Sequence, residues 1–468
     1  ADLGQGPLVF ERRVIPLEPG SVYLLRGPRQ VGKSTLIKQH IRELIQKDVD
    51  PHSIMYYPCD YVGSVRELRR IIEFHLERNR GAENLYIFLD EITYLRNWNR
   101  EIKAQVDAGL LRRAALILTG SGAAQLRRQA EQLPGRGLEG NQYLLYPLTF
   151  REFLLQASDS ITKGQDVELM RSLATVRKRL EDISFSLEDS SQEQMDTLDK
   201  FMPYGPDLDA LLRFYLMTGG FPQTINRFAR ASLKSIEDEA YNTMMQVVLG
   251  DFSKQGKEEA LARQIIEGIL RRHGTRFSYP TLTNEVDATH PTVLQYLETL
   301  NDSLLTQTIY SIDFKRGTSR YKADKKVYLS DPFLYHSTNA FAKGLEGFPL
   351  SVESLDDETI LSSLVESVVA SHLTQTRVAP YLAEPMTFLY FFYNPRKEVD
   401  FVYRKKSGEF TGIEVKYGRQ ETKYRFPNIS QLKERIILTR DSVEFDKDEP
   451  QAPVALFLSL LDKSPSCL

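Results

Sequence analysis

The chain has 468 residues, of which 41% are hydrophobic and 26% charged. This globular composition is long enough for about three domains and excludes a mostly disordered or fibrous protein. The net charge of -3 argues against a globally basic protein that coats nucleic acid, although a local basic surface stays open. Two cysteines exclude a disulfide framework. With no long apolar run and no leader, we expect a cytoplasmic protein without a membrane partner.

Residues 1–155 alternate short apolar runs with helix-like stretches, which predicts an α/β domain with a parallel sheet. The runs are short, continuous and β-rich, as buried parallel strands are. They lie at residues 22–25, 54–57, 85–89, 115–118 and 143–146. An amphipathic helix is expected from Lys33 to about Gln46, directly after the loop that follows the first strand.

The middle of the chain, residues 156–258, is first acidic and then helical. Residues 156–210 are predicted to be an acidic insertion, either a surface arm or a mobile or disordered segment, because residues 159–209 hold 12 Asp and Glu against 6 Lys and Arg. Residues 211–258 are expected to form a helical lid or linker. The turn Gly219-Gly220-Phe221-Pro222 marks the return to packed structure.

Residues 259–340 show three helical stretches followed by two strands, the order of a winged helix. The third helix, at residues 291–301, carries no arginine, which base-reading helices commonly use. Only the loop between the strands looks suited to phosphates, through Lys315, Arg316, Arg320 and Lys322. The module therefore either touches nucleic acid through this loop, or packs between domains or against a protein.

One motif has the spacing of a phosphate-binding loop, G-x-x-x-x-G-K-[ST], and lies between a strand and a helix. It consists of Gly27, Pro28, Arg29, Gln30, Val31, Gly32, Lys33 and Ser34, followed by Thr35. The glycines let backbone N–H groups approach phosphates, and the helix N-terminus adds positive potential. We expect Lys33 to reach the β- and γ-phosphates and Ser34 to bind Mg²⁺.

An acidic pair, Asp90 and Glu91, ends the third predicted strand. Ligands of open α/β sheets bind at the carboxyl ends of the strands, so Asp90 is expected to position hydrated Mg²⁺ beside the phosphate-binding loop. Glu91 is expected to orient and deprotonate an attacking water. The pair therefore favours nucleotide hydrolysis over nucleotide binding alone.

Two further residues are candidates for sensing the γ-phosphate. Ser121 follows the fourth predicted strand, where it would contact the phosphate or the water unless it is a simple turn residue. Arg136, in a Pro-Gly-Arg-Gly turn, is a candidate arginine finger that would neutralise charge on the transferred phosphoryl group. An ordinary surface arginine is the alternative, and action within its own subunit or across an interface both stay open.

The C-terminal residues 341–468 contain a predicted hairpin with charged residues on one face. Its strands are 398–404 and 410–416, after an aromatic-rich strand at 387–393. The apolar faces coincide only if Phe401 pairs with Ile413, which places Asp400 opposite Glu414. That register needs an odd-length loop, and Lys406-Ser407-Gly408 supplies three residues with glycine last. Residues 395–440 hold 12 Lys and Arg against 6 Asp and Glu, a local basic surface that suits phosphate backbones.

The ordered set of motifs resembles an archaeal and bacterial group of AAA-type ATPases. The motifs are GPRQVGKST, LDEI, LTGSGA, LPGRG followed by YPLTFREF, and GGFP. In this group a P-loop domain precedes a winged helix and a C-terminal restriction-endonuclease-like domain, so the resemblance covers nearly the whole chain except the acidic insertion. It implies an ATPase with ATP and Mg²⁺ as ligands. The expected fold is therefore a P-loop NTPase sheet, an all-helical and winged-helix region, and an α/β endonuclease-like domain.

In the last domain the resemblance to PD-(D/E)xK nucleases covers four residues. Asp400 and Glu414 match the carboxylates that bind Mg²⁺, and Lys416 matches the lysine that helps deprotonate the water or neutralises charge. Glu366, on the predicted helix 361–373, matches a glutamate that often completes the metal site. A charged, solvated hairpin is the alternative, and nuclease activity stays open.

Two functional hypotheses follow. The first is an ATP-hydrolysing motor or switch acting on nucleic acid, DNA being favoured over RNA, with a Mg²⁺-dependent nuclease-like domain. The second is a regulatory ATP-dependent switch that binds a protein partner through the insertion or the winged helix, with a catalytically inactive C-terminal domain. Both are compatible with a homo-oligomer.

Overall fold

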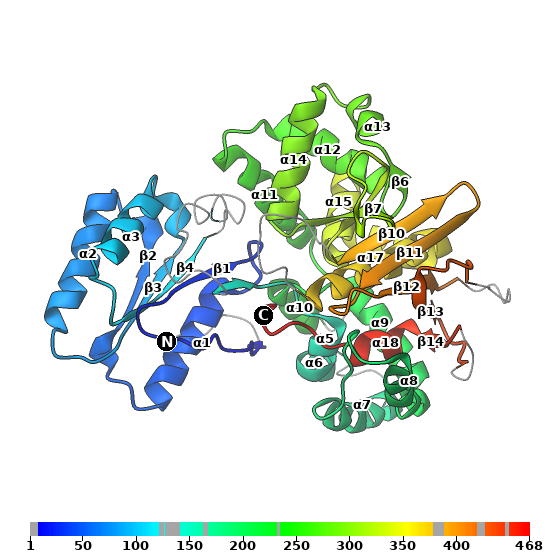
Figure 1. Ribbon diagram of the computed structural model, residues 1–468, viewed down its shortest axis with the longest axis horizontal. Helices are drawn as coiled ribbons and strands as arrows, with labels where there is room; N and C mark the ends of the chain where they lie inside the picture. Colours follow the sequence, from blue (N-terminus) through cyan, green and yellow to red (C-terminus); the bar gives the residue numbers. More distant parts are fainter. Residues whose placement is uncertain are drawn as a thin grey trace. The chain divides into compact units, whose positions relative to one another are not determined.

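The computed structural model describes residues 8–120, 126, 141–161, 167–231, 235–377, 388–418, 426–444 and 449–468. The chain divides into two compact units, each described by itself below (Figure 1). Unit 1 comprises the chain up to Tyr146 together with residues 302–304 and 465–468, and unit 2 comprises the remainder.

Unit 1 is built on a five-stranded parallel sheet in the order β2-β3-β4-β1-β5. Its strands are β1 (Val22–Arg26), β2 (Ile54–Pro58), β3 (Leu85–Asp90), β4 (Ala114–Thr119) and β5 (Gln142–Leu144). Its helices are α1 (Lys33–Gln46), α2 (Val65–Arg78) and α3 (Trp98–Asp107), with short 3₁₀ turns η1 (Pro51–Ser53), η2 (Cys59–Tyr61) and η3 (Ile92–Tyr94). The predicted parallel sheet and its five strands are confirmed.

Helices cover both faces of this sheet. On one face, Leu68 and Ile72 of α2 and Trp98 of α3 join Ile87 and Leu89 of β3 in a single apolar core. Successive residues of a strand point to opposite faces. Phe88 accordingly faces α1, where its ring centroid lies 6.3 Å from that of His40. The continuous apolar run of β3 is thus explained, because both of its faces are buried.

Unit 2 begins with helices and ends with a mixed sheet. The first helices are α5 (Phe150–Gln156), α6 (Ser158–Ile161), α7 (Val167–Leu180), α8 (Ser191–Asp199), η4 (Met202–Tyr204), α9 (Gly205–Thr218), α10 (Pro222–Ala231), α11 (Asp238–Lys254), α12 (Glu259–Arg271), α13 (Tyr279–Thr283) and α14 (His290–Asp302). The later helices are α15 (Pro332–Lys343), α16 (Gly347–Asp356), α17 (Glu358–Gln375) and α18 (Val454–Leu460).

The sheet of unit 2 has nine strands in the order β14-β13-β12-β11-β10-β7-β9-β6, with β8 paired to β7. The strands are β6 (Arg276–Phe277), β7 (Thr306–Asp313), β8 (Thr318–Ser319), β9 (Lys325–Leu329), β10 (Leu389–Asn394), β11 (Lys397–Arg404), β12 (Phe410–Lys416), β13 (Leu432–Thr439) and β14 (Gln451–Pro453). The parallel pairing of β10 with β7 joins the strands of the predicted winged helix to those of the predicted C-terminal domain. One sheet therefore runs through both segments (Figure 1).

The predicted register of the C-terminal hairpin is confirmed. Phe401 pairs with Ile413, and Arg404 pairs with Phe410. Gly408 has φ 91°, the left-handed conformation that the three-residue loop requires.

The predicted acidic arm is a packed part of unit 2 in its described residues. Its buried side chains include Phe185, Leu187, Met195 and Leu198. The ring centroids of Phe185 and Phe457 are 5.3 Å apart. Glu188 accepts a hydrogen bond from the backbone N–H of Lys406 at 2.8 Å. The expectation of a surface arm or a mobile segment is wrong for residues 173–210, because spaced apolar side chains form a buried face despite the acidic composition.

The Gly219-Gly220 turn is explained by a buried carboxylate. Asp331 accepts hydrogen bonds from the N–H of Gly220, at 2.7 Å, and of Phe333, at 2.8 Å, where it caps α15. Gly219 has φ 62° and ψ −170°, a conformation that is essentially restricted to glycine. A Cβ at Gly219 would lie 2.1 Å from Oδ1 of Asp331.

Gly219→Ala should destabilise unit 2 by about 3 kcal/mol, because backbone strain adds to the displacement of Asp331. The matched control is Gly250→Ala on α11, where a Cβ meets no heavy atom within 4 Å. That change should stabilise by about 0.5 to 1 kcal/mol through helix propensity. Denaturant unfolding followed by circular dichroism measures both; equal midpoints for the two variants would contradict the assignment.

Candidate functional site

The phosphate-binding loop joins β1 to α1 in unit 1. Lys33 Nζ donates hydrogen bonds to the carbonyl oxygens of Gly27 and Pro28, both at 2.9 Å, so the lysine lies along the loop. Gln30 and Gly32 have positive φ angles of 62° and 103°, which curl the backbone N–H groups of the loop. Arg29 precedes Gln30, and Val31 lies between Gln30 and Gly32.

The start of α1 is suited to an anion. No side chain caps its N-terminus and its first turn holds no acidic residue. Ser34, which is exposed, and Thr35 lie in this first turn. A Cβ at Gly27 would lie 2.4 Å from the carbonyl oxygen of Leu145, so the loop tolerates only glycine there. These residues fit a nucleoside triphosphate.

Asp90 ends β3 at the same edge of the sheet as the phosphate-binding loop. The register aligns Leu25 of β1 with Thr119 of β4, and Leu89 of β3 with Leu118. Because β4 is the only strand between β1 and β3, the ends of these two strands are separated by roughly 10 Å. The predicted meeting of the lysine and aspartate at one edge is therefore supported by topology and register.

Two side chains that the sequence prediction missed hold Asp90. Thr119 Oγ1 donates to Oδ1 of Asp90, and the Tyr56 hydroxyl donates to Oδ2 at 3.1 Å. Burial, followed by Asp90, raises the pKa of Tyr56 above its ordinary value, so this hydroxyl remains a donor. The signal for Thr119 was its position at the end of the neighbouring strand; Tyr56 carried no comparable signal.

Glu91 has a left-handed backbone, with φ 56° and ψ 38°. Its N–H donates to Thr119 Oγ1 at 3.2 Å, so Thr119 contacts both members of the acidic pair. Left-handed non-glycine residues are uncommon and gather at functional sites. Ser121 and Arg136 lie outside the described residues.

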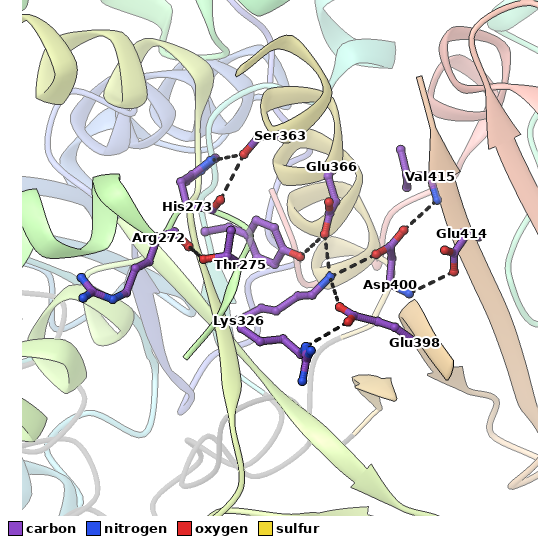
Figure 2. Close-up of polar contacts among 12 residues, drawn as sticks. Arg272, His273, Thr275, Lys326, Ser363, Glu366, Glu398, Asp400, Glu414 and Val415 are labelled. Carbon is purple, nitrogen blue, oxygen red and sulfur yellow. Dashed lines mark hydrogen bonds and ion pairs between the residues drawn. The ribbon is translucent and has the colours of Figure 1, made fainter. Parts of the chain in front are cut away.

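The four residues of the predicted nuclease-like site lie together in unit 2. The N–H of Asp400 donates to Glu414 at 3.3 Å, and Lys416 Nζ lies 2.8 Å from Glu414 and 3.9 Å from Asp400. Glu366 projects from α17 toward the same cluster (Figure 2). The structure therefore brings these four residues together, and their role as a nuclease-like site stays a prediction.

A fifth residue, Lys326 of β9, lies among the carboxylates. Its Nζ is 3.0 Å from Glu366, 3.0 Å from Asp400 and 3.3 Å from Glu398 (Figure 2). The three N–H groups of the ammonium therefore match three carboxylates, and the Lys326 side chain is only 4% exposed. Sequence reasoning missed Lys326 because it placed this strand in a separate domain.

Lys326, Lys416 and the carboxylates around them form an ion network in which the charged groups shift one another's pKa values. Although burial opposes its charged form, the pKa of Lys326 lies well above its ordinary value because of Tyr328, Asp400 and the two glutamates. Burial likewise opposes ionisation of Asp400, but Lys326 and Lys416 hold its pKa below the usual value. Burial, followed by Asp400, raises the pKa of Glu366 to about 7.

The described carboxylates of the cluster surround the ammonium of Lys326. Among the residues that the structure describes, no group of three or more His, Cys, Asp or Glu side chains could hold a metal ion. The ammonium of Lys326 lies at the point where Glu366 and Asp400 converge, which is where a shared cation would bind. None of the described helices combines the length and apolar character needed to cross a bilayer.

Comparison with protein families divides the chain into three matches. Residues 20–154 match the model of an AAA domain. Residues 209–344 and 361–452 match two domains of unknown function, DUF8612 and DUF4143. No curated protein matches the chain.

Solved structures with similarity to the chain share little sequence with it. The Aeropyrum pernix Orc1 protein, in complex with DNA, is 13% identical with a TM-score of 0.30, covering 70% of this chain and 89% of its own. Cdc6p from Pyrobaculum aerophilum is 14% identical with a TM-score of 0.24, covering 75% of this chain and 88% of its own. The family match and the geometry of the loop therefore support an AAA-type P-loop ATPase domain in residues 20–154.

Proposed function

We propose that the chain is an ATP-hydrolysing switch of the AAA type. Residues Gly27 to Thr35 would hold the triphosphate, with Lys33 moving from the loop carbonyls to the β- and γ-phosphates. Ser34 and Asp90 would hold Mg²⁺, which neutralises phosphate charge when bound. Glu91 would orient the attacking water and accept its proton.

The observation that carries this proposal is the convergence at one sheet edge. The uncapped N-terminus of α1, the buried Lys33 and the hydrogen-bonded Asp90 lie at the ends of β1 and β3. The Thr119 hydroxyl donates a hydrogen bond to Asp90 and accepts one from the backbone N–H of Glu91. ATP, rather than GTP, follows from the motif resemblance. Ser121 as phosphate sensor and Arg136 as arginine finger remain predictions.

Lys33→Ala should weaken ATP binding by about 100-fold or more, because a charge-assisted contact to the phosphates is lost. Isothermal titration with ATP and Mg²⁺ measures the affinity. The control is Lys47→Ala, at the exposed far end of α1, which should bind ATP as the unchanged protein does. Equal affinity of the Lys33→Ala variant would remove the loop from nucleotide binding.

For the C-terminal site, we infer a structural ion network rather than a nuclease centre. The contacts of Lys326 with Glu366, Asp400 and Glu398 support this inference, because its ammonium provides the positive charge that a metal would bring. This favours the second hypothesis for the C-terminal domain. That the chain acts as a switch with a nucleic-acid or protein partner remains a prediction.

A further inference from the structure

A pocket of about 440 Å³ lies within unit 2, between α13, α14 and the strands β7 and β9. Its walls include the aromatic rings of Tyr279, Tyr310 and Tyr321, and its cationic residues are Lys322 and Lys325. The volume is in the range of small-ligand sites. Its lining residues all belong to residues 278–325.

Lys325 and Lys326 are neighbours on β9, so their side chains point to opposite faces. Both residues are buried, at 2% and 3% exposed. Lys326 contacts three carboxylates, whereas Lys325 Nζ contacts the Tyr321 carbonyl oxygen at 3.4 Å and the ring of Tyr279, with its centroid at 3.3 Å. Among the described residues, no carboxylate lies within 4.0 Å of the Lys325 ammonium.

A buried ammonium without a counter-charge is unfavourable unless an anion joins it. Burial lowers the pKa of Lys325 to about 8, and Asp324 opposes this only in part. Lys325 therefore stays mostly charged at neutral pH at a cost to the fold. An anionic ligand in the pocket would remove that cost.

We propose that this pocket binds a nucleotide unit, with its phosphate on Lys325 and its base against the tyrosines. The inference extends the proposed function by naming a ligand for unit 2, and it does not require ATP hydrolysis. Tyr310 and Tyr321 stand edge to face, with centroids 5.2 Å apart, and Tyr321 is 49% exposed. Such partly exposed rings are platforms for unstacked bases.

The surroundings of the pocket favour a nucleotide within a single strand. A second hollow of about 540 Å³ shares Tyr321 and Lys322 with it and is lined by Arg316 and Arg320, which flank β8 between β7 and β9. Phosphates that flank the bound nucleotide would contact these cations. An exposed carboxylate, Glu298, also lines the pocket and would repel an anion. Removing its charge should therefore strengthen anion binding, whereas removing Lys325 should weaken it.

The test is fluorescence anisotropy with a labelled thymidine DNA strand of about 12 nucleotides, its RNA counterpart, and a duplex of the same length. All proteins are full chains carrying Lys33→Ala, so that failure of the ATP site does not affect the result. Lys325→Met should weaken single-strand binding about tenfold or more. Glu298→Gln should strengthen it about two- to fivefold. Tyr321→Ala should weaken it about tenfold.

Thermal unfolding separates a binding defect from a folding defect. Lys325→Met should leave the unfolding midpoint unchanged or higher, because an unpaired buried charge is removed. Should that variant fail to fold, Glu298→Gln and Tyr321→Ala, both at exposed positions, decide the matter. Competition by thymidine monophosphate that depends on Lys325 identifies a free nucleotide as the source, and binding of the strand alone identifies single-stranded nucleic acid. Binding that is indifferent to all three changes, or strongest for duplex, overturns the proposal.

Discussion

Glu91→Gln should lower the rate of ATP hydrolysis by about 100-fold or more while ATP remains bound. The amide keeps the size of the carboxylate but does not accept the proton of the attacking water. Since Lys33 and Asp90 are unchanged, nucleotide affinity should stay within about threefold of the original value. Single-turnover phosphate release measures the chemical step, and filter retention of labelled ATP measures the trapped complex.

The control for this experiment is Glu83→Gln, an exposed carboxylate just before β3. It changes the net charge by the same amount and should hydrolyse ATP normally. The left-handed backbone of Glu91 is held by Thr119, so a second comparison is Thr119→Val, which removes the hydroxyl that contacts both acidic residues. Full hydrolysis by the Glu91→Gln variant would assign the base elsewhere.

Lys326→Ala should destabilise unit 2 by about 3 to 5 kcal/mol, because it leaves Glu366, Asp400 and Glu398 without their shared cation. The neighbouring Lys325→Met is the control, since that ammonium has no carboxylate partner in the described part of the chain and its loss should not destabilise. Denaturant unfolding compares the two variants. Equal decreases in the free energy of unfolding would show that burial of the lysine side chains on β9, rather than the ion network, determines the effect.

Metal titration sharpens the same experiment. Removing the Lys326 side chain leaves carboxylates around an enlarged space, so Mn²⁺ should raise the unfolding midpoint of Lys326→Ala by several degrees. The unchanged protein should show no such shift, and it should leave plasmid DNA intact with Mg²⁺ or Mn²⁺. Metal-dependent cleavage by the unchanged protein that is lost in Asp400→Asn would restore the nuclease hypothesis.

The sequence was most informative where the governing interactions are local. The phosphate-binding loop, the strand ending at Asp90 and the hairpin register of Phe401 with Ile413 follow from spacing and parity over a few residues. Buried parallel strands are recognisable because each is a continuous apolar run. These features were predicted without knowledge of the tertiary contacts.

What the sequence did not reveal depends on contacts between distant segments. Lys326 and Asp400 are 74 residues apart and meet because β10 pairs with β7. Tyr56 reaches Asp90 from a neighbouring strand that carries no polar motif. The packing of Phe185 against Phe457 likewise arises from tertiary structure, which overrides the acidic composition of its segment.

The pairing of β10 with β7 also governs how the chain can be divided. A fragment ending near residue 340 would expose the backbone N–H and C=O groups along one side of β7, an open edge prone to aggregation. The same cut would separate Lys326 from the acidic residues of α17 and β11. Winged-helix and C-terminal segments should therefore be expressed as one piece, whatever boundary their sequence motifs suggest.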